Sequence, residues 1–112
     1  MEELRTKDDL YNTIQTEKEV VIEYFMNGCK HCIEAEKFFS EHEIDFPVYK
    51  YNVGNDIGFA RAHKIITAPT LIYYKNGKEV VRAKDARSIT VGVNDERKRD
   101  NDYRFFKTGR VS

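Results

Sequence analysis

Residues 20–32 read VVIEYFMNGCKHC and join an apolar run of strand length to a Cys-x-x-Cys pair. Apart from Glu23, the run at residues 20–25 is apolar on both faces, as in a central strand that is covered on both sides. After a short polar turn, Cys29 and Cys32 open a pattern that predicts a helix to about residue 42, with Cys32, Ala35 and Phe39 on one inward face. A cysteine pair on the first turn of a helix that follows a strand is typical of a redox-active site.

The length and charge of the chain limit the classes of protein to which it can belong. Its 112 residues fit one compact domain. The 19 basic and 19 acidic residues give a formal net charge of zero, so no bulk field attracts nucleic acid or an anionic membrane. The first residues, MEELR, do not resemble a signal peptide, and no apolar stretch is long enough to span a bilayer. We therefore expect a monomeric, cytoplasmic protein without nucleic-acid or membrane partners.

Both cysteines of the chain fall within this one motif, which leaves two chemical interpretations. A structural disulfide would be unusual in the cytoplasm, so redox chemistry and metal binding remain. A structural zinc site needs four ligands, and the chain offers only these two cysteines and three scattered histidines. Redox chemistry is therefore the favoured interpretation, and half of a zinc site is the alternative.

The remaining patterns predict a small mixed sheet. Thr6 and Asp9 resemble a capping box at the start of the first helix. Asn76-Gly77 predicts a hairpin, because these residues tolerate the positive φ angles of a two-residue turn. The predicted elements are a helix at 6–18, strands at 20–25 and 46–53 around the helix at 29–42, a short helix at 54–64 carrying Ile57 and Ala60, and strands at 70–74 and 79–82. A parallel βαβ half joined to an antiparallel hairpin predicts an α/β fold with three layers, α/β/α.

The C-terminal segment has a different composition. We expect the folded domain to cover residues 1–88 and residues 89–112 to form an atypical charged segment. Ile89, Val91 and Val93 alternate around Gly92, and the charged run NDERKRDND follows at residues 94–102. Asp95 could cap a short helix that docks the aromatic residues Tyr103, Phe105 and Phe106. The alternatives are a solvated, mobile tail and a tail that docks a partner.

On these motifs the chain resembles the thioredoxin superfamily over roughly residues 5–84. The most specific parts of the resemblance are Cys29-Lys30-His31-Cys32 and Ala68-Pro69-Thr70. The resemblance implies that the Ala68–Pro69 bond is cis and lies beside the cysteine pair, where the backbone before the proline can pair with an extended substrate strand. The alternative is an ordinary trans proline at the start of a strand.

The resemblance also implies separate roles for the two cysteines, which would form a disulfide in the oxidised protein. Cys29, at the start of the helix, is expected to be the attacking thiolate, since the unpaired N–H groups and the helix dipole favour an anion there. Lys30 and His31 add positive charge and are expected to contact substrate. Cys32, one turn later and facing the core, is the expected resolving thiol.

Glu23 is the only ionisable residue in its strand, six positions before Cys29. An isolated buried carboxylate is costly, so this group would tend to hold a proton near neutral pH. The resemblance implies that a buried acid here assists proton transfer to and from Cys32, although the family residue is usually the shorter aspartate. Lys50 falls where the family often has a lysine that faces this acid. The alternatives are a Glu23 that reaches solvent and a Lys50 on the surface, as we expect for His42 and His63.

The chain departs from the family pattern around the cysteines. Gly28 precedes Cys29 in place of the usual tryptophan, the chain has no tryptophan, and Lys30-His31 replaces Gly-Pro. A histidine before the second cysteine is typical of oxidising branches, so this pair is expected to be less strongly reducing. The predicted function is a thiol–disulfide oxidoreductase that acts on protein disulfides and needs no cofactor beyond its dithiol. The resemblance suggests ribonucleotide reductase as a substrate and a thioredoxin reductase as electron donor. A redox-independent adapter subunit is the alternative.

Overall fold

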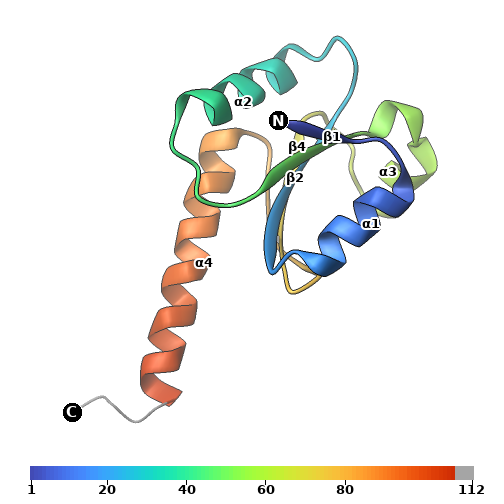
Figure 1. Cartoon of the computed structure of the whole chain (residues 1–112). Coiled ribbons are helices and arrows are strands. Elements are labelled where there is room, and N and C mark those ends of the chain that lie inside the picture. The colour runs from blue at the N-terminus through green and yellow to red at the C-terminus, as the bar shows by residue number, and fades with distance from the viewer. Residues whose placement is uncertain (108–112) are drawn as a thin grey trace.

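The structure is a computed structural model of the chain, which describes residues 1–107 and their side chains as far as residue 101. Helices and strands alternate along most of the chain (Figure 1). In order they are β1 (Glu2–Leu4), α1 (Lys7–Thr16), β2 (Glu19–Phe25), α2 (Lys30–Glu41), β3 (Val48–Asn52), the 3₁₀ turn η1 (Val53–Asn55), α3 (Ile57–Ala62), β4 (Thr70–Lys75), β5 (Lys78–Ala83) and α4 (Ala86–Lys107).

The five strands form one mixed sheet in the order β1-β3-β2-β4-β5. β1 and β2 run parallel to β3, whereas β4 is antiparallel to both β2 and β5. This arrangement confirms the predicted βαβ half and hairpin, and it places β2 at the centre of the sheet. The edge strand β1 was not predicted, because three residues are too few to show an alternating pattern.

Helices cover both faces of the sheet, as the apolar run of β2 predicts (Figure 1). On one face, Ile22 and Tyr24 pack with Leu10 of α1 and Phe59 of α3. On the other face, Val21 of β2 and Leu71 and Tyr73 of β4 pack with Ile89 and Val93 of α4. Phe39 of α2 lies against this cluster. The three-layer α/β/α architecture is therefore confirmed.

Local signals in the sequence account for several boundaries. The Thr6 hydroxyl caps α1 by accepting a hydrogen bond from the N–H of Asp9 at 3.0 Å. Asn76 and Gly77 have φ angles of 52° and 81°, as the predicted two-residue turn requires. β3 is shorter than the predicted strand at 46–53, because it begins after Pro47, and the following helix divides into η1 and α3.

The C-terminal segment differs most from its prediction, because α4 runs through 22 residues as one helix. The expected boundary between residues 88 and 89 lies inside its first turn, and Ile89 and Val93 are fully buried against the sheet. Gly92 does not interrupt the helix. A Cβ at this position would lie 2.6 Å from Cγ1 of Val81, so the glycine allows α4 to approach β5 closely.

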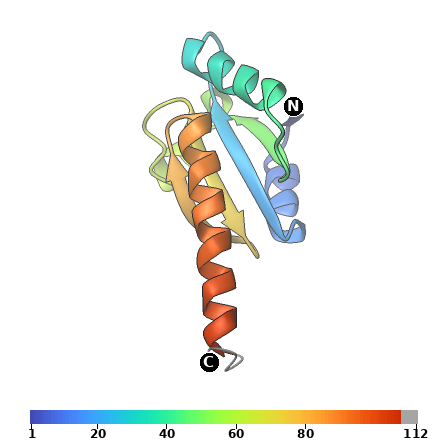
Figure 2. The same cartoon turned by 90° about the vertical axis from the view of Figure 1, so that its left-hand side faces the viewer.

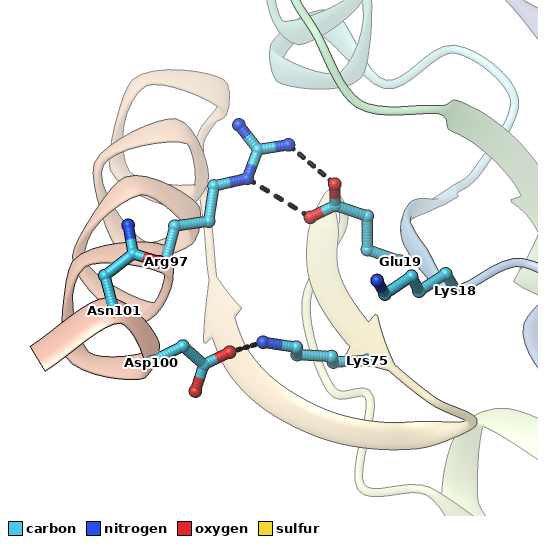
Figure 3. Close-up of a pocket in the computed structure, with 6 residues that line it drawn as sticks. All are labelled: Lys18, Glu19, Lys75, Arg97, Asp100 and Asn101. Atoms are coloured by element: carbon cyan, nitrogen blue, oxygen red, sulfur yellow. Dashed lines mark hydrogen bonds and ion pairs between the residues drawn. The ribbon is translucent and has the colours of Figure 1, made fainter. Parts of the chain in front are cut away.

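Between Val93 and residue 101, the last residue with a described side chain, α4 is joined to the rest of the molecule by ion pairs. Arg97 donates hydrogen bonds to the carboxylate of Glu19 at 2.7 and 3.2 Å, and Lys75 pairs with Asp100 (Figure 3). Arg97 also reaches Asp45 at 2.8 Å. The charged run is therefore helical and continues α4, where a short helix capped by Asp95 was one of the alternatives.

The expected docking of the C-terminal aromatic residues concerns side chains outside the described part of the chain: Tyr103, Phe105 and Phe106. Figure 2 shows α4 continuing past the end of the sheet. Within residues 1–107, none of the helices combines the length and the apolar composition that crossing a bilayer requires.

Candidate active site

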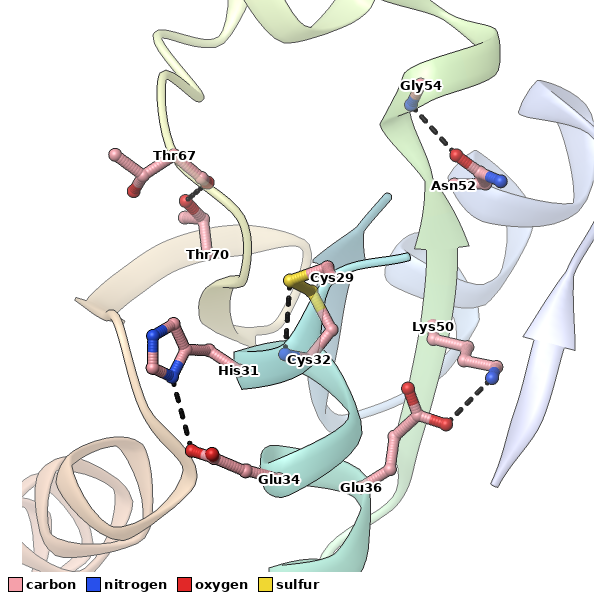
Figure 4. Close-up of a disulfide and its surroundings, with 10 residues drawn as sticks. All are labelled: Cys29, His31, Cys32, Glu34, Glu36, Lys50, Asn52, Gly54, Thr67 and Thr70. Carbon is pink, nitrogen blue, oxygen red and sulfur yellow. Dashed lines mark hydrogen bonds and ion pairs between the residues drawn. A yellow bond between two sulfur atoms is a disulfide. The ribbon is translucent and has the colours of Figure 1, made fainter. Parts of the chain in front are cut away.

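The cysteine pair lies where the central strand β2 passes into α2. Gly28, with a φ angle of 74°, completes the turn after the strand. Cys29 is the N-cap residue of α2, and its sulfur accepts a hydrogen bond from the backbone N–H of Cys32 at 3.1 Å (Figure 4). The N-terminus of the helix therefore points its free N–H groups toward the outer sulfur, as the sequence predicts.

Cys29 and Cys32 form a disulfide, and the two cysteines differ in solvent exposure. Cys29 is partly exposed, whereas Cys32 is only 2% exposed and faces the core together with Ala35. A thiol from another molecule can therefore approach Cys29 and not Cys32. The described residues contain no group of three or more histidine, cysteine or acidic side chains arranged to hold a metal ion.

The Ala68–Pro69 bond is cis, as the resemblance implies. Pro69 directly precedes β4, whose first residue, Thr70, lies opposite Tyr24 near the end of β2. The loop is held by a hydrogen bond that the Thr70 hydroxyl donates to the carbonyl of Thr67 at 2.7 Å (Figure 4). The proline loop and the cysteine turn therefore meet at the same end of the sheet.

An apolar cleft of about 320 Å³ lies between these two loops and α3. Exposed side chains of the cysteine turn, α3 and the proline loop line it, together with the half-buried Ala68. The exposed lining residues are Met26, Ile57, Arg61, Ile66 and Thr67. Ile66 is 87% exposed, which is unusual for a large apolar side chain. Met26 and Ile66 were not assigned to a site from the sequence, and Ile57 was expected only as a residue of the short helix.

Glu23 is completely buried in β2, which excludes the alternative that it reaches solvent. Neither of its carboxyl oxygens has a hydrogen-bond partner among the described residues. Burial, together with the negative charge of Glu36, raises the pKa of Glu23 from 4.5 to about 8, and the positive charge of Lys50 opposes this rise. The group is therefore mostly protonated at neutral pH.

Lys50 lies opposite Glu23 in the register of β2 and β3, but its ammonium group bonds elsewhere. The Nζ atom donates to Oε1 of Glu36 on α2 at 2.8 Å (Figure 4) and lies 4.8 Å from the centre of the Phe25 ring. Lys50 is thus half-buried rather than a free surface residue. Glu36 was missed by the sequence analysis, although its position four residues after Cys32 puts both on one side of α2.

The remaining predicted residues lie at the surface. Lys30 and His31 are exposed, and Nδ1 of His31 is 3.2 Å from Oε2 of Glu34. His42 and His63 are also exposed, as expected. The His42 ring stacks on Phe38 of α2, and the His63 ring lies against Phe59 of α3. The structure thus gathers the cysteine pair, the proline loop and the buried acid at one end of β2, with Lys30 and His31 at their rim.

The sequence model of the Thioredoxin family matches residues 3–93. The chain belongs to the thioredoxin family. The match includes both cysteines, Pro69 and the first turns of α4, so the whole site lies inside the shared region. With the Cys29–Cys32 disulfide, family membership supports a thiol–disulfide oxidoreductase, as the sequence analysis predicts.

Named relatives of this thioredoxin-family chain include two yeast proteins. It is 32% identical over 78 residues to thioredoxin-2 of Saccharomyces cerevisiae, covering 67% of this chain and 75% of the relative. Identity to thioredoxin-1 of the same yeast is 28% over 94 residues, covering 80% and 89%. Among solved structures, a thioredoxin of Plasmodium falciparum has a TM-score of 0.73 at 17% identity, covering 85% of this chain and 98% of that one. The fold of this thioredoxin-family protein is therefore that of a thioredoxin.

Proposed function

We propose that the protein reduces or exchanges disulfide bonds of other proteins through its Cys29/Cys32 dithiol. The observation that carries this proposal is the disulfide at the start of α2, in which one cysteine is partly exposed and the other is buried. Such an arrangement separates an attacking sulfur from a resolving sulfur. The adjoining apolar cleft provides surface for a protein substrate.

In the reduced protein, the Cys29 thiolate attacks one sulfur of a substrate disulfide. A mixed disulfide forms, and the other substrate sulfur leaves as a thiolate, which takes a proton. Cys32, once deprotonated, attacks the Cys29 sulfur, and the second substrate sulfur leaves. Two electrons have then passed from the dithiol to the substrate, and the Cys29–Cys32 disulfide has formed.

The start of α2 favours the thiolate form of Cys29. Its sulfur already accepts a hydrogen bond from the Cys32 N–H at 3.1 Å in the oxidised protein, and the same donor can stabilise a thiolate. Lys30 and His31 add positive charge at the exposed edge, although Glu34 partly offsets that of His31. These two residues contact the bound substrate in our proposal.

In the fraction of molecules in which it is ionised, Glu23 is proposed to accept the proton of the Cys32 thiol, and to return it when the disulfide is reduced. Support comes from its complete burial, from its lack of hydrogen-bond partners among the described residues and from a pKa of about 8. A group with this pKa can both gain and lose a proton near neutral pH. Because Cys32 is buried, water has little access to its thiol, and a buried acid can exchange the proton in place of water. Lys50 acts on this acid through its charge.

The substrate is proposed to bind as an extended segment along the proline loop. The backbone before Pro69, at Thr67 and Ala68, would pair with the segment on either side of the target cysteine. An apolar side chain of the substrate would enter the cleft beside Met26 and Ile66. By resemblance to the family, ribonucleotide reductase is a candidate substrate and a thioredoxin reductase is a candidate electron donor. We place the activity of the monomer in the cytoplasm, without nucleic-acid or membrane partners.

Insulin reduction with dithiothreitol as the reductant tests this proposal. The wild-type protein should accelerate precipitation of the insulin chains, and Cys29→Ser should be no faster than dithiothreitol alone. The exposed-residue variant Glu43→Gln serves as a control and should match the wild type. Equal rates for wild type and Cys29→Ser would contradict the proposed chemistry.

A redox-independent adapter is the second candidate function. It is favoured by one feature, the continuation of α4 for 14 residues beyond residue 93, where the family match ends. Genetic complementation separates the two candidates. If the Cys29→Ser/Cys32→Ser double variant fully rescues a deletion strain, the adapter function is correct, and loss of rescue supports redox chemistry.

A further inference from the structure

Three ionisable side chains gather between α2 and the central strands. Glu23 comes from β2, Lys50 from β3 and Glu36 from α2. Register partners in a parallel pair of strands point to the same face of the sheet, so Glu23 and Lys50 share the face that α2 covers. The single ammonium group of Lys50 therefore lies in the same cluster as two carboxyl groups, those of Glu23 and Glu36.

Lys50 bonds to the more exposed of these two acids. Its Nζ atom is 2.8 Å from Oε1 of Glu36, whose side chain is 27% exposed (Figure 4). Both oxygens of the fully buried Glu23 lack a partner among the described residues. A buried carboxyl without a partner is more stable with its proton than as an anion.

No other charged group on the described elements compensates Glu23. On β4 its register partner is Leu71, and α4 presents Ile89 and Val93 to this face of the sheet. The other polar group that α2 turns inward is Cys32, four residues before Glu36. The charged groups that act on Glu23 are Glu36, which favours its protonated form, and Lys50, which favours its ionised form.

We propose that Glu36 is a positioning residue that holds the Lys50 ammonium away from Glu23 and so keeps the buried acid protonated at neutral pH. Without Glu36, the Lys50 ammonium loses its hydrogen-bond partner, and Glu23, its register partner on β2, is a carboxyl on which its charge already acts. A cation beside Glu23 would favour the ionised form, and the removed negative charge of Glu36 would act in the same direction.

The consequence concerns the proton exchange proposed for the resolving cysteine. Glu36 lies one turn after Cys32 on α2. In this proposal, the residue that sets the proton affinity of Glu23 and the thiol that exchanges a proton with Glu23 therefore belong to the same helix. This inference rests on the proposed function only for the role of Glu23 in catalysis. The ionisation of Glu23 is measurable without any substrate, so the two proposals can fail separately.

The test is an NMR titration of the Glu23 side-chain carboxyl in the oxidised, ¹³C-labelled protein, with the signal assigned by its absence in Glu23→Gln. The titration midpoint, near pH 8 in the wild type, should fall by about one pH unit or more in Glu36→Ala. Glu36→Gln should lower it by less, because its amide oxygen can still accept a hydrogen bond from Lys50. Glu34→Ala removes an acid that pairs with His31 on the same helix, and it should leave the midpoint unchanged.

A second pair of variants separates positioning from direct repulsion between the two acids. In a Lys50→Met background, which itself should raise the midpoint, Glu36→Ala should shift it by less than half as much as in the wild-type background. An equal shift in both backgrounds would overturn the proposal, since Glu36 would then act by its own charge. An unchanged midpoint in both Glu36 variants would overturn it as well.

Discussion

Replacing Glu23 with glutamine should remove a pH dependence of stability that the buried acid imposes. In the folded protein the pKa of Glu23 is raised from 4.5 to about 8. Because the folded state holds this proton more tightly than the unfolded state, the contribution of Glu23 to stability is fully present below pH 4.5. It is lost as the pH rises through 8, because the unfolded chain releases the proton first.

The size of the effect follows from the shift. Each unit of pKa difference corresponds to about 1.4 kcal/mol, so between pH 4.5 and pH 7 the wild type should lose about 3 kcal/mol of unfolding free energy through this group. The full loss, reached above pH 8, is about 5 kcal/mol. A glutamine side chain cannot titrate, so the Glu23→Gln variant should gain stability relative to wild type by these amounts as the pH rises.

Urea unfolding of the oxidised proteins, followed by circular dichroism because the chain has no tryptophan, measures this difference at half-unit steps from pH 4.5 to 8.5. The exposed-residue variant Glu43→Gln is the control, and its stability should run parallel to that of the wild type. If the Glu23→Gln and wild-type curves are also parallel, Glu23 ionises at its ordinary pH and the reasoning from burial is refuted.

Three further outcomes are expected. Replacing Lys30-His31 with Gly-Pro removes positive charge that favours the Cys29 thiolate, so the reduction potential should fall by up to about 30 mV, toward the value of about −270 mV typical of thioredoxin. Equilibration with glutathione measures this potential. An unchanged potential would mean that the helix terminus alone sets it. Gly92→Ala should lower the unfolding free energy by about 1–3 kcal/mol in urea, because its Cβ would meet Cγ1 of Val81 at 2.6 Å, and an unaffected stability would contradict that contact. Ile66→Ser should leave the unfolding free energy unchanged but reduce kcat/KM for an apolar disulfide peptide about fivefold. This factor equals about 1 kcal/mol of lost apolar contact with the substrate. An unchanged kcat/KM would exclude the cleft from substrate binding.

The parts of the fold that were predictable from sequence are those encoded by neighbouring residues. The apolar run at 20–25 identified the central strand, and Asn76-Gly77 identified the hairpin, because each pattern depends on local backbone geometry. The disulfide and the cis bond at Pro69 were expected only through the resemblance to the family.

The parts that were missed depend on contacts between distant residues. In the described part of α4 the buried side chains are those of Ala86, Ile89 and Val93, which make too thin a stripe to predict a long helix. Arg97 is held by Glu19, 78 positions away. Glu36 looks like any exposed helix acid until the sheet brings Lys50 to 2.8 Å from it. No local pattern signals either arrangement.

The central claim, that Cys29 attacks substrate disulfides and Cys32 resolves them, is tested most directly by trapping the intermediate. Reduced Cys32→Ser is mixed with a peptide that contains one disulfide, and the products are weighed by mass spectrometry without added reductant. The account predicts a mixed disulfide between the peptide and Cys29 in this variant and no stable adduct with Cys29→Ser. An adduct that accumulates on Cys32 in the Cys29→Ser variant, and not on Cys29 in Cys32→Ser, would contradict the account.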